Sequence, residues 1–333
     1  MSHSNSSLNC FANCMAKYEH QYVKHTRPCR PPSPHLVFGT MAHEVLYKAG
    51  CLRDEQNDNV ADDEYTTVIP SEVLYHELKN EFGIKSWQAY FLPIIAKIAE
   101  YEDDIVKEFT ERGESVIVAR EVKLQITVDE LQKLYGKTIT QPLVGVIDYL
   151  VIGSNSAVIL DNKFSANRKG QDEFDMNSQL PLYMYLVNKR YGIPVNNIKV
   201  GYVDIPKQSF ETPKLLSNGT LSRAKSQNVS QELYEQAVIT VHGDDEHYNC
   251  KPGGYYYDAW CNMAFNKSAY LTLQYMDLDA YNGIIDDLIK AAKMVDFMET
   301  CNLPFLKKYD SYSCKSCDYL KACKPWLEVN FNE

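Results

Sequence analysis

Three features that would assign a protein class at once are missing from this sequence. Although 45% of the 333 residues are hydrophobic, no long apolar run without charges occurs, so we expect no membrane span. Residues 1–30 lack the apolar core of a secretory signal, which predicts a cytoplasmic protein. Gly136-Lys137-Thr138 resembles the end of a phosphate-binding loop, but Leu131 replaces the glycine required five positions earlier. No motor motif is therefore visible, and any unwinding of nucleic acid would need a partner.

An excess of positive charge is also absent, because the formal net charge is -10. Net charge bears on solubility, however, whereas nucleic-acid binding needs only a local basic surface. Arg168 and Lys169 form one candidate for such a surface. A second candidate, which an ordinary solvated face explains equally well, is the N-terminal group of Lys17, Lys24, His25, Arg27 and Arg30.

Charged residues occur at the end of a predicted buried strand. An apolar, β-prone run leads into Asp161 and Lys163, whose spacing of two places both side chains on the same side of a strand. A second predicted strand, residues 143–152, carries Asp148 and reaches the first through Gly153-Ser154-Asn155, a plausible hairpin turn. Two carboxylates and an ammonium group on paired strands suit a hard divalent cation and a polarised water.

Four motifs occur in an order that resembles the PD-(D/E)XK nuclease superfamily, in particular its RecB-like branch. They are a GxxxH motif, a GxxD motif, a (D/E)xK motif and a QxxxY motif, at Gly39–His43, Gly145–Asp148, Asp161–Lys163 and Gln179–Tyr183. Each motif alone is weak, but four in order at ordinary spacings are strong evidence. The resemblance implies an α/β restriction-endonuclease-like core, with a central mixed sheet flanked by helices, in one nuclease domain over residues 1–333.

The resemblance also implies a ligand set for Mg²⁺ or Mn²⁺. Asp148 and Asp161 would bind the ion through carboxylate oxygens, and Asn162 would add its backbone carbonyl. His43 would supply an imidazole, which favours Mn²⁺ somewhat over Mg²⁺. A solitary histidine in an apolar helix is usually a structural or surface residue, but the GxxxH context favours the ligand role for His43.

The remaining motif residues would act on the substrate. Lys163 would orient or help to deprotonate the attacking water and offset charge in the transition state. Gln179 and Tyr183 would position the scissile phosphate or the DNA backbone, although Tyr183 is also surrounded by leucines that suit simple core packing. Glu121, in a predicted strand over 116–127, resembles a glutamate that precedes GxxD in relatives, and an ordinary surface glutamate is equally consistent.

Cysteines make a separate case for a second metal site. The chain has 10 cysteines, and reduced thiols that cluster in sequence indicate a metal more often than a disulfide. Cys314, Cys317 and Cys323 form a CxxCxxxxxC motif. The fourth thiolate must come from elsewhere, and Cys14 is the leading candidate, with Cys10 one helical turn earlier as a competitor.

The start of this cysteine set is similar to that of the iron–sulfur RecB-like nucleases, which include CRISPR-adaptation nucleases and helicase–nuclease nuclease domains. Their CPxxY segment matches Cys14–Tyr18, except that Met15 replaces the usual proline. In that group one N-terminal and three C-terminal cysteines hold a 4Fe–4S cluster, which implies a clasp between the chain ends here. Zn²⁺ remains the alternative metal for these thiolates. We expect the other cysteines to be small core residues, namely Cys29, Cys51, Cys250, Cys261 and Cys301.

The remaining sequence predicts the elements around the site. A helical insertion over 50–112 contains a polar loop at 51–65, and a mobile loop spans 206–231. The cysteine segment at 301–333 pairs with Cys14. Helices are expected at 36–49, 87–109, 175–189 and 281–298, and one further strand at 198–205.

These expectations favour a metal-dependent DNA exonuclease that hydrolyses phosphodiester bonds from DNA ends in recombination, repair or phage DNA processing. Exonuclease activity is what the iron–sulfur relatives imply. Two alternatives stay open: a protein that binds DNA ends without cutting, and a structural subunit of a helicase–nuclease or recombination complex. Co-purification of a helicase or a single-strand annealing protein as partner would support the second alternative.

Overall fold

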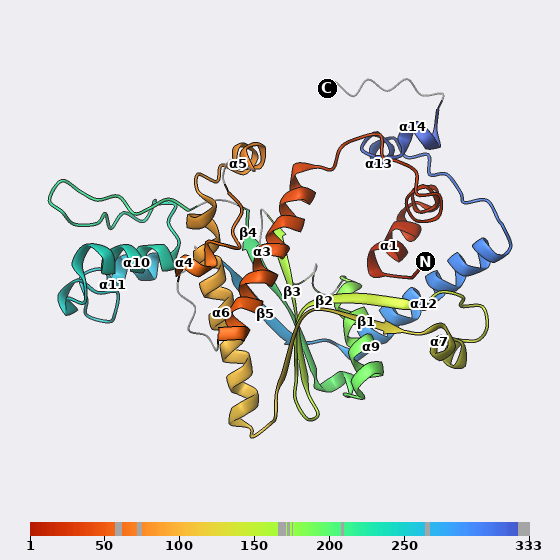
Figure 1. The fold of residues 1–333 in the computed structure, drawn as a ribbon, viewed down its shortest axis with the longest axis horizontal. Coiled ribbons are helices and arrows are strands. Elements are labelled where there is room, and N and C mark those ends of the chain that lie inside the picture. The colour runs from red at the N-terminus through yellow and green to blue at the C-terminus, as the bar shows by residue number, and fades with distance from the viewer. Residues whose placement is uncertain are drawn as a thin grey trace.

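A five-stranded sheet lies at the centre of the computed structural model, which describes residues 1–56, 62–71, 75–165, 171, 174, 176–207, 210–263 and 267–325 (Figure 1). The strands follow the order β1-β2-β3-β4-β5. They are β1 (Ile117–Ile126), β2 (Leu143–Ile152), β3 (Ala157–Ser165), β4 (Ile198–Pro206) and β5 (Tyr270–Tyr275). The pairing of β3 with β4 is parallel, and the other three pairings are antiparallel. The sheet is therefore mixed, as predicted.

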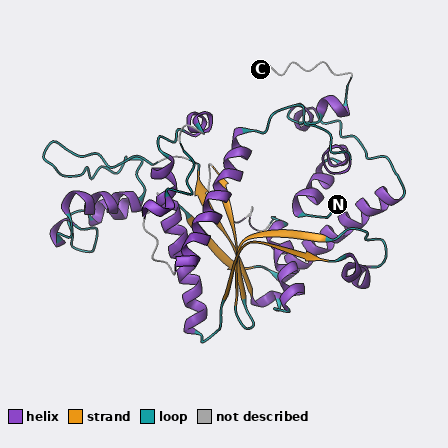
Figure 2. Cartoon of the chain, viewed as in Figure 1, coloured by secondary structure: helices purple, strands orange, loops and turns teal. Residues whose placement is uncertain are grey.

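Helices cover both faces of this sheet (Figure 2). One face packs against α1 (Asn5–Asn13), α9 (Gln179–Tyr191) and α12 (Leu278–Thr300). The other face packs against α3 (Pro34–Gln56) and α6 (Trp87–Glu111). The shorter helices are α2 (Met15–Tyr18), η1 (Glu19–Val23), α4 (Asp62–Tyr65), α5 (His76–Phe82), α7 (Val128–Tyr135), η2 (Val195–Asn197), α10 (Gln231–His242), η3 (Glu246–Tyr248), α11 (Tyr257–Asn262), α13 (Ser311–Lys315) and α14 (Leu320–Cys323).

Side-chain periodicity explains this layering. On β3, Ala157 and Ile159 enter the core beneath α9, whereas Val158 and Leu160 enter the core beneath α6. Apolar residues recur along α6 at helical spacing, and its first turn is capped by Ser86, whose hydroxyl accepts from the Ala89 amide at 3.3 Å. The helix predicted at 87–109 is thus confirmed, and it forms a core layer of the fold.

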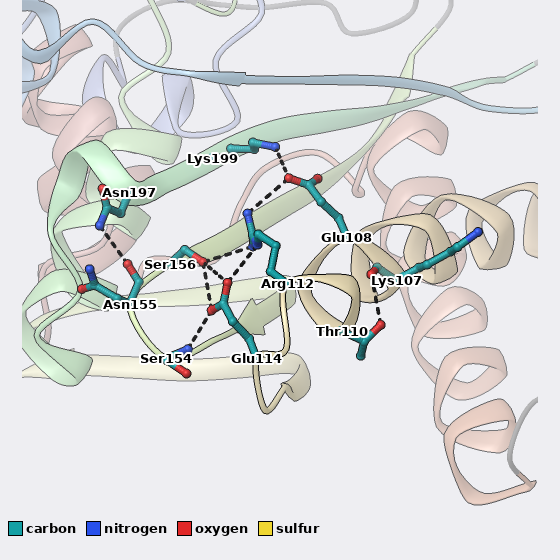
Figure 3. A network of polar contacts seen from close by, with 10 residues as sticks. All are labelled: Lys107, Glu108, Thr110, Arg112, Glu114, Ser154, Asn155, Ser156, Asn197 and Lys199. Carbon is teal, nitrogen blue, oxygen red and sulfur yellow. Dashed lines mark hydrogen bonds and ion pairs between the residues drawn. The ribbon is translucent and has the colours of Figure 1, made fainter.

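The predicted hairpin between β2 and β3 is confirmed, because the amide of Gly153 donates to the carbonyl of Ser156 at 2.9 Å. Polar contacts tie this turn to the end of α6 (Figure 3). The Glu114 carboxylate accepts from the Ser154 amide at 2.9 Å, and Glu108 pairs with Lys199 of β4 at 2.7 Å. These contacts fix the end of the sheet that lies away from Asp161 and Lys163.

The predictions for three segments were wrong in part. The helix expected at 36–49 runs from Pro34 to Gln56, and α4 also falls in the segment expected to be a loop at 51–65. Tertiary contacts explain the longer helix, since Arg53 is buried and its guanidinium lies 2.5 Å from the Glu102 carboxylate of α6. The helix expected at 175–189 begins at Gln179, and residue 175 lies outside the described residues.

β5 and a small unit built from α10 and α11 were not predicted from the sequence. This unit has its own apolar cluster, which includes Tyr234, Val238 and Tyr256. The predicted loop at 206–231 leads into it and contains a single bridge, between Leu215 and Leu221, among its described residues. Its mobility stays a prediction. Among the described helices, none has the length and apolar character needed to cross a membrane.

Candidate active site

Three elements bring the predicted site residues to one cleft. Buried residues at helical spacing, Phe38, Ala42, Val45 and Ala49, fix α3 on the sheet, and His43 therefore faces sideways into the cleft. Asp148 of β2 and Lys163 of β3 reach the same cleft from the paired strands. The cleft has a volume of about 660 Å³.

Three potential metal ligands meet in this cleft. One ligand atom each from His43, Glu121 and Asp148 lies within 4.8 Å of the other two, and we call these residues the ligand trio. His43 Nδ1 lies 3.4 Å from Asp148 Oδ2. Burial, followed by the charge of Lys163, lowers the pKa of His43 to about 4, so the imidazole is neutral at neutral pH and keeps a lone pair for a metal.

Burial and mutual repulsion disfavour the charged forms of the carboxylates of the site, a condition that we call electrostatic strain. Burial and, after it, the neighbouring Asp161 carboxylate raise the pKa of Asp148 well above its ordinary value, and Glu121 adds to the effect. Burial also raises the pKa of Asp161, against the opposing effect of Lys163. A divalent cation would relieve this repulsion, and two carboxylates with one imidazole form a suitable donor set for Mg²⁺ or Mn²⁺.

Glu121 reaches the ligand trio through an unusual backbone conformation. Its φ is +45°, in the left-handed region that non-glycine residues adopt at a cost of about 1–2 kcal/mol. On either side of it, Arg120 pairs with Tyr149 and Val122 pairs with Ile147 in regular register. Local distortion of this kind is concentrated at functional sites. The structure thus places Glu121 in the trio, a role that the sequence left open.

A buried ion network holds the backbone beside Glu121. Arg120 donates to both Glu102 carboxylate oxygens at 2.7 Å and to Asp54 at 2.8 Å. The same Glu102 carboxylate contacts Arg53, so the network joins α3, α6 and β1. Buried ion pairs of this type contribute geometry more reliably than net stability. The network therefore links the helix that carries His43 to the strand that carries Glu121.

Asp161 and Lys163 lie on the same side of β3, as predicted from their spacing. Asp161 is 1% exposed, and its Oδ2 lies 2.5 Å from Lys163 Nζ. Gln179 holds the pair: its Nε2 donates to Asp161 Oδ1 and its Oε1 accepts from Lys163 Nζ, both at 2.9 Å. The same Nε2 donates to the hydroxyl of the buried Tyr183 at 2.7 Å. Gln179 and Tyr183 thus position the pair from behind, and their predicted contact with a phosphate stays a prediction.

The predicted metal ligands lie at two different depths in the protein. His43, Asp148 and Asn162 line the cleft, whereas Asp161 lies beneath it and is not a member of the ligand trio. The amide of Asn162 donates to Asp148 Oδ2 at 2.7 Å, which orients that carboxylate. The metal-ligand roles predicted for Asp161 and for the Asn162 carbonyl stay predictions.

Steric contacts explain why position 145, in the GxxD motif, is occupied by glycine. A Cβ atom at this position would lie 2.7 Å from Leu186 Cδ1 and 2.9 Å from Tyr183 Cε1, because α9 packs directly against β2 there. Close packing at Gly145 thereby fixes the helix that carries Gln179.

Replacing Gly145 should therefore destabilise the fold. We expect Gly145→Val to lower the free energy of unfolding by about 2 kcal/mol or more, since it overfills a packed core. Urea denaturation followed by circular dichroism measures the change. Gly39→Ala is the matched control, because a Cβ at Gly39 meets no atom within 4 Å. Equal stability of the two variants would contradict the steric role of Gly145.

The segment that carries α13 and α14 lies beside the N-terminal segment that follows α1 (Figure 1). The amide of Ala16 donates to the Leu306 carbonyl at 3.2 Å, and that of Cys29 donates to the Asp318 carbonyl at 2.7 Å. Arg30 of the predicted basic group also reaches the Lys315 carbonyl, at 2.7 Å. We call residues 14–30 together with residues 301–325 the clasp.

The cysteines predicted as ligands lie in the clasp. The pKa of Cys317 and of Cys323 is raised, mainly by burial and also by the neighbouring Cys14 thiol. Cys314 Sγ accepts from Lys324 Nζ at 3.2 Å. All ten cysteines carry free thiols. Cys10 is half-buried against the main core, and burial raises its pKa to about 11.

The prediction for the other cysteines was only partly right. Cys250 is buried as expected, but Cys301 is exposed, and Cys51 and Cys261 are half-buried. Cys29 lies in the clasp, where its thiol donates to the Asp318 carbonyl at 2.8 Å. Residues 168 and 169, the other predicted basic group, lie outside the described residues.

Comparison with known proteins identifies one family. The family model of the PD-(D/E)XK nuclease superfamily matches residues 2–324. No curated protein matches the sequence. A solved structure from Eubacterium rectale, provisionally named an exonuclease, is similar at 10% identity and a TM-score of 0.47, covering 99% of this chain and 91% of that chain. The structure named SSO0001 is similar at 14% identity and a TM-score of 0.26, covering 77% and 82%.

Proposed function

Because the chain belongs to the PD-(D/E)XK nuclease superfamily, we propose that it is a metal-dependent DNA exonuclease that hydrolyses phosphodiester bonds from DNA ends. The observation that carries the proposal is the arrangement of the cleft, in which the ligand trio and Lys163 face the same space. Ligands for a cation and an ammonium group at one end of a sheet are the components that metal-assisted phosphodiester hydrolysis needs.

His43, Glu121 and Asp148 would hold Mg²⁺ or Mn²⁺, and Asp161 with the Asn162 carbonyl would complete the set from β3. When bound, the ion supplies Lewis acidity, which lowers the pKa of a bound water and offsets phosphoryl charge. The donor set supports this fit, because one ligand atom each from His43, Glu121 and Asp148 lies within 4.8 Å of the other two. The neutral imidazole of His43 favours Mn²⁺ somewhat over Mg²⁺.

Lys163 would act on the attacking water and on the transition state. Its ammonium group is fixed between the Asp161 carboxylate and the Gln179 amide, so its direction is set before substrate arrives. A positive charge held in this place stabilises the pentacoordinate phosphorus without further reorganisation. Asp161 thereby serves two groups, the cation site and the lysine.

Digestion of labelled DNA tests the activity and its mode. We expect Mn²⁺-dependent loss of end-labelled linear DNA, with covalently closed circular DNA left intact, because an exonuclease requires an end. Single-stranded and double-stranded forms of each substrate identify the preferred strand state. Cleavage of circles would instead indicate an endonuclease. DNA binding without any cleavage would favour the non-cleaving DNA-end-binding alternative.

We also propose that Cys14, Cys314, Cys317 and Cys323 hold a 4Fe–4S cluster that closes the clasp. A 4Fe–4S cluster takes four thiolates, one on each iron atom. Backbone hydrogen bonds from Ala16 to Leu306 and from Cys29 to Asp318 bring together the two segments that carry these four cysteines.

Replacing Cys14 tests the cluster. We expect anaerobically purified protein to absorb visible light and contain about four iron atoms, and Cys14→Ser to lose most of both because one of four ligands is gone. Cys301→Ser is the control, since Cys301 is exposed and outside the motif. Iron analysis and absorption spectra measure the outcome. Colourless wild-type protein with stoichiometric zinc would contradict the cluster.

A further inference from the structure

The catalytic cleft continues past the ligand trio to Lys207, the residue after β4. Its amide donates to the Ser165 carbonyl at 3.2 Å, and Ser165 lies two residues beyond Lys163 on β3. Two residues of strand correspond to roughly 7 Å, so the backbone of Lys207 lies beyond that of Lys163 along the direction of β3. His35, Gly39 and Thr40 of α3 also line the cleft.

Lys207 is a half-buried cation without an acidic partner. Its ammonium group lies 5.9 Å from the Phe38 ring centroid and 5.8 Å from the Phe82 ring centroid. Desolvation lowers its pKa, and no carboxylate of the described residues lies within ion-pair distance. By contrast, Lys163 of the same cleft is paired with Asp161. Aromatic rings compensate an ammonium group only in part, so this position favours an anionic ligand.

Gly39 provides open space beside this cation. A glycine within a helix costs about 1 kcal/mol relative to alanine, yet a Cβ at Gly39 would meet no atom within 4 Å. Packing therefore does not require this glycine, in contrast to Gly145, where a side chain would collide with α9. The missing side chain leaves the backbone of α3 accessible from the cleft, which suits close approach by the backbone of a ligand.

We propose that Lys207, Gly39 and His35 form a binding subsite for the phosphodiester group next to the one that is cleaved. This inference rests on the proposed nuclease function and assigns the ligand of the cleft beyond the metal site. Lys207 supplies the charge, His35 lines the outer wall with its ring against Phe82, and Gly39 admits the sugar–phosphate chain. The ligand class is a nucleic-acid backbone, and base identity plays no part in its recognition.

Binding of a fluorescein-labelled single-stranded oligonucleotide, measured by anisotropy with Ca²⁺ at several salt concentrations, tests the subsite independently of cleavage. We expect Lys207→Ala to weaken binding about 10-fold and to reduce the salt slope by roughly 0.7. Lys207→Arg should restore most of the affinity because it keeps the charge. Lys293→Ala is the matched control, since Lys293 is also half-buried over a ring, that of Tyr135, but lies on α12 away from the cleft.

The variant Gly39→Ala provides a second test of the proposed subsite. It should leave the melting temperature unchanged or raised while weakening binding, because the added methyl group narrows the cleft. If Lys207→Ala and Gly39→Ala bind like wild type, or if wild-type protein binds no oligonucleotide, the subsite is wrong. If wild type binds and Lys207→Ala does not, but Mn²⁺ supports no cleavage, the subsite holds and the exonuclease proposal fails.

Discussion

Lys163→Ala is expected to reduce Mn²⁺-dependent DNA cleavage by about 10²–10⁴-fold, the range typical for loss of a proton-transfer or charge-stabilising group. The ammonium group contacts Asp161 at 2.5 Å and Gln179 at 2.9 Å, and removal leaves the attacking water without this oriented cation. Single-turnover cleavage of end-labelled linear DNA measures the chemical step directly.

Lys199→Ala is the matched control for this experiment. The two lysine side chains are 26% and 24% exposed, they lie on the adjacent strands β3 and β4, and each pairs with one acidic residue. Lys199, however, belongs to the network at the far end of the sheet (Figure 3). Equal loss of activity in both variants would assign Lys163 a structural role and remove it from the mechanism.

Asp148→Asn is expected to abolish cleavage and, at the same time, to stabilise the metal-free protein. The folded pKa of Asp148 is raised, so its contribution to stability is present at low pH and is lost as pH rises through that raised pKa. At neutral pH the buried charge is thus a cost, which the neutral amide removes. Asparagine also keeps an oxygen that accepts from the Asn162 amide. We therefore expect the variant to unfold at a higher urea concentration than wild type at neutral pH.

Urea denaturation in EDTA at several pH values measures this gain. The difference between Asp148→Asn and wild type should shrink as pH falls through the folded pKa, and added Mn²⁺ should stabilise wild type more than the variant. Glu44→Gln serves as the control, since Glu44 lines the same cleft but is exposed and paired with Lys48. A variant less stable than wild type in EDTA would contradict electrostatic strain at Asp148.

The sequence alone determined those features that depend on interactions between residues close together in the chain. Alternation along a strand placed Asp161 and Lys163 on one side of β3, and Gly153 closed the hairpin that brings Asp148 beside them. Apolar periodicity likewise predicted α6, because a helix that covers a sheet must bury one face. These features depend on neighbours in the chain, and so the sequence alone was sufficient.

Tertiary structure decided which charged groups meet. Nothing near Glu121 in the sequence signals its φ of +45°, since the conformation arises where β1 meets β2 beside a network anchored in α3 and α6. Lys207 likewise enters the cleft only because β4 pairs in parallel with β3. The length of α3 was misjudged because contacts between Arg53 and Glu102, far apart in sequence, stabilise its last turns. Interactions between distant segments carry no local periodicity, and the folded sheet alone brings them together.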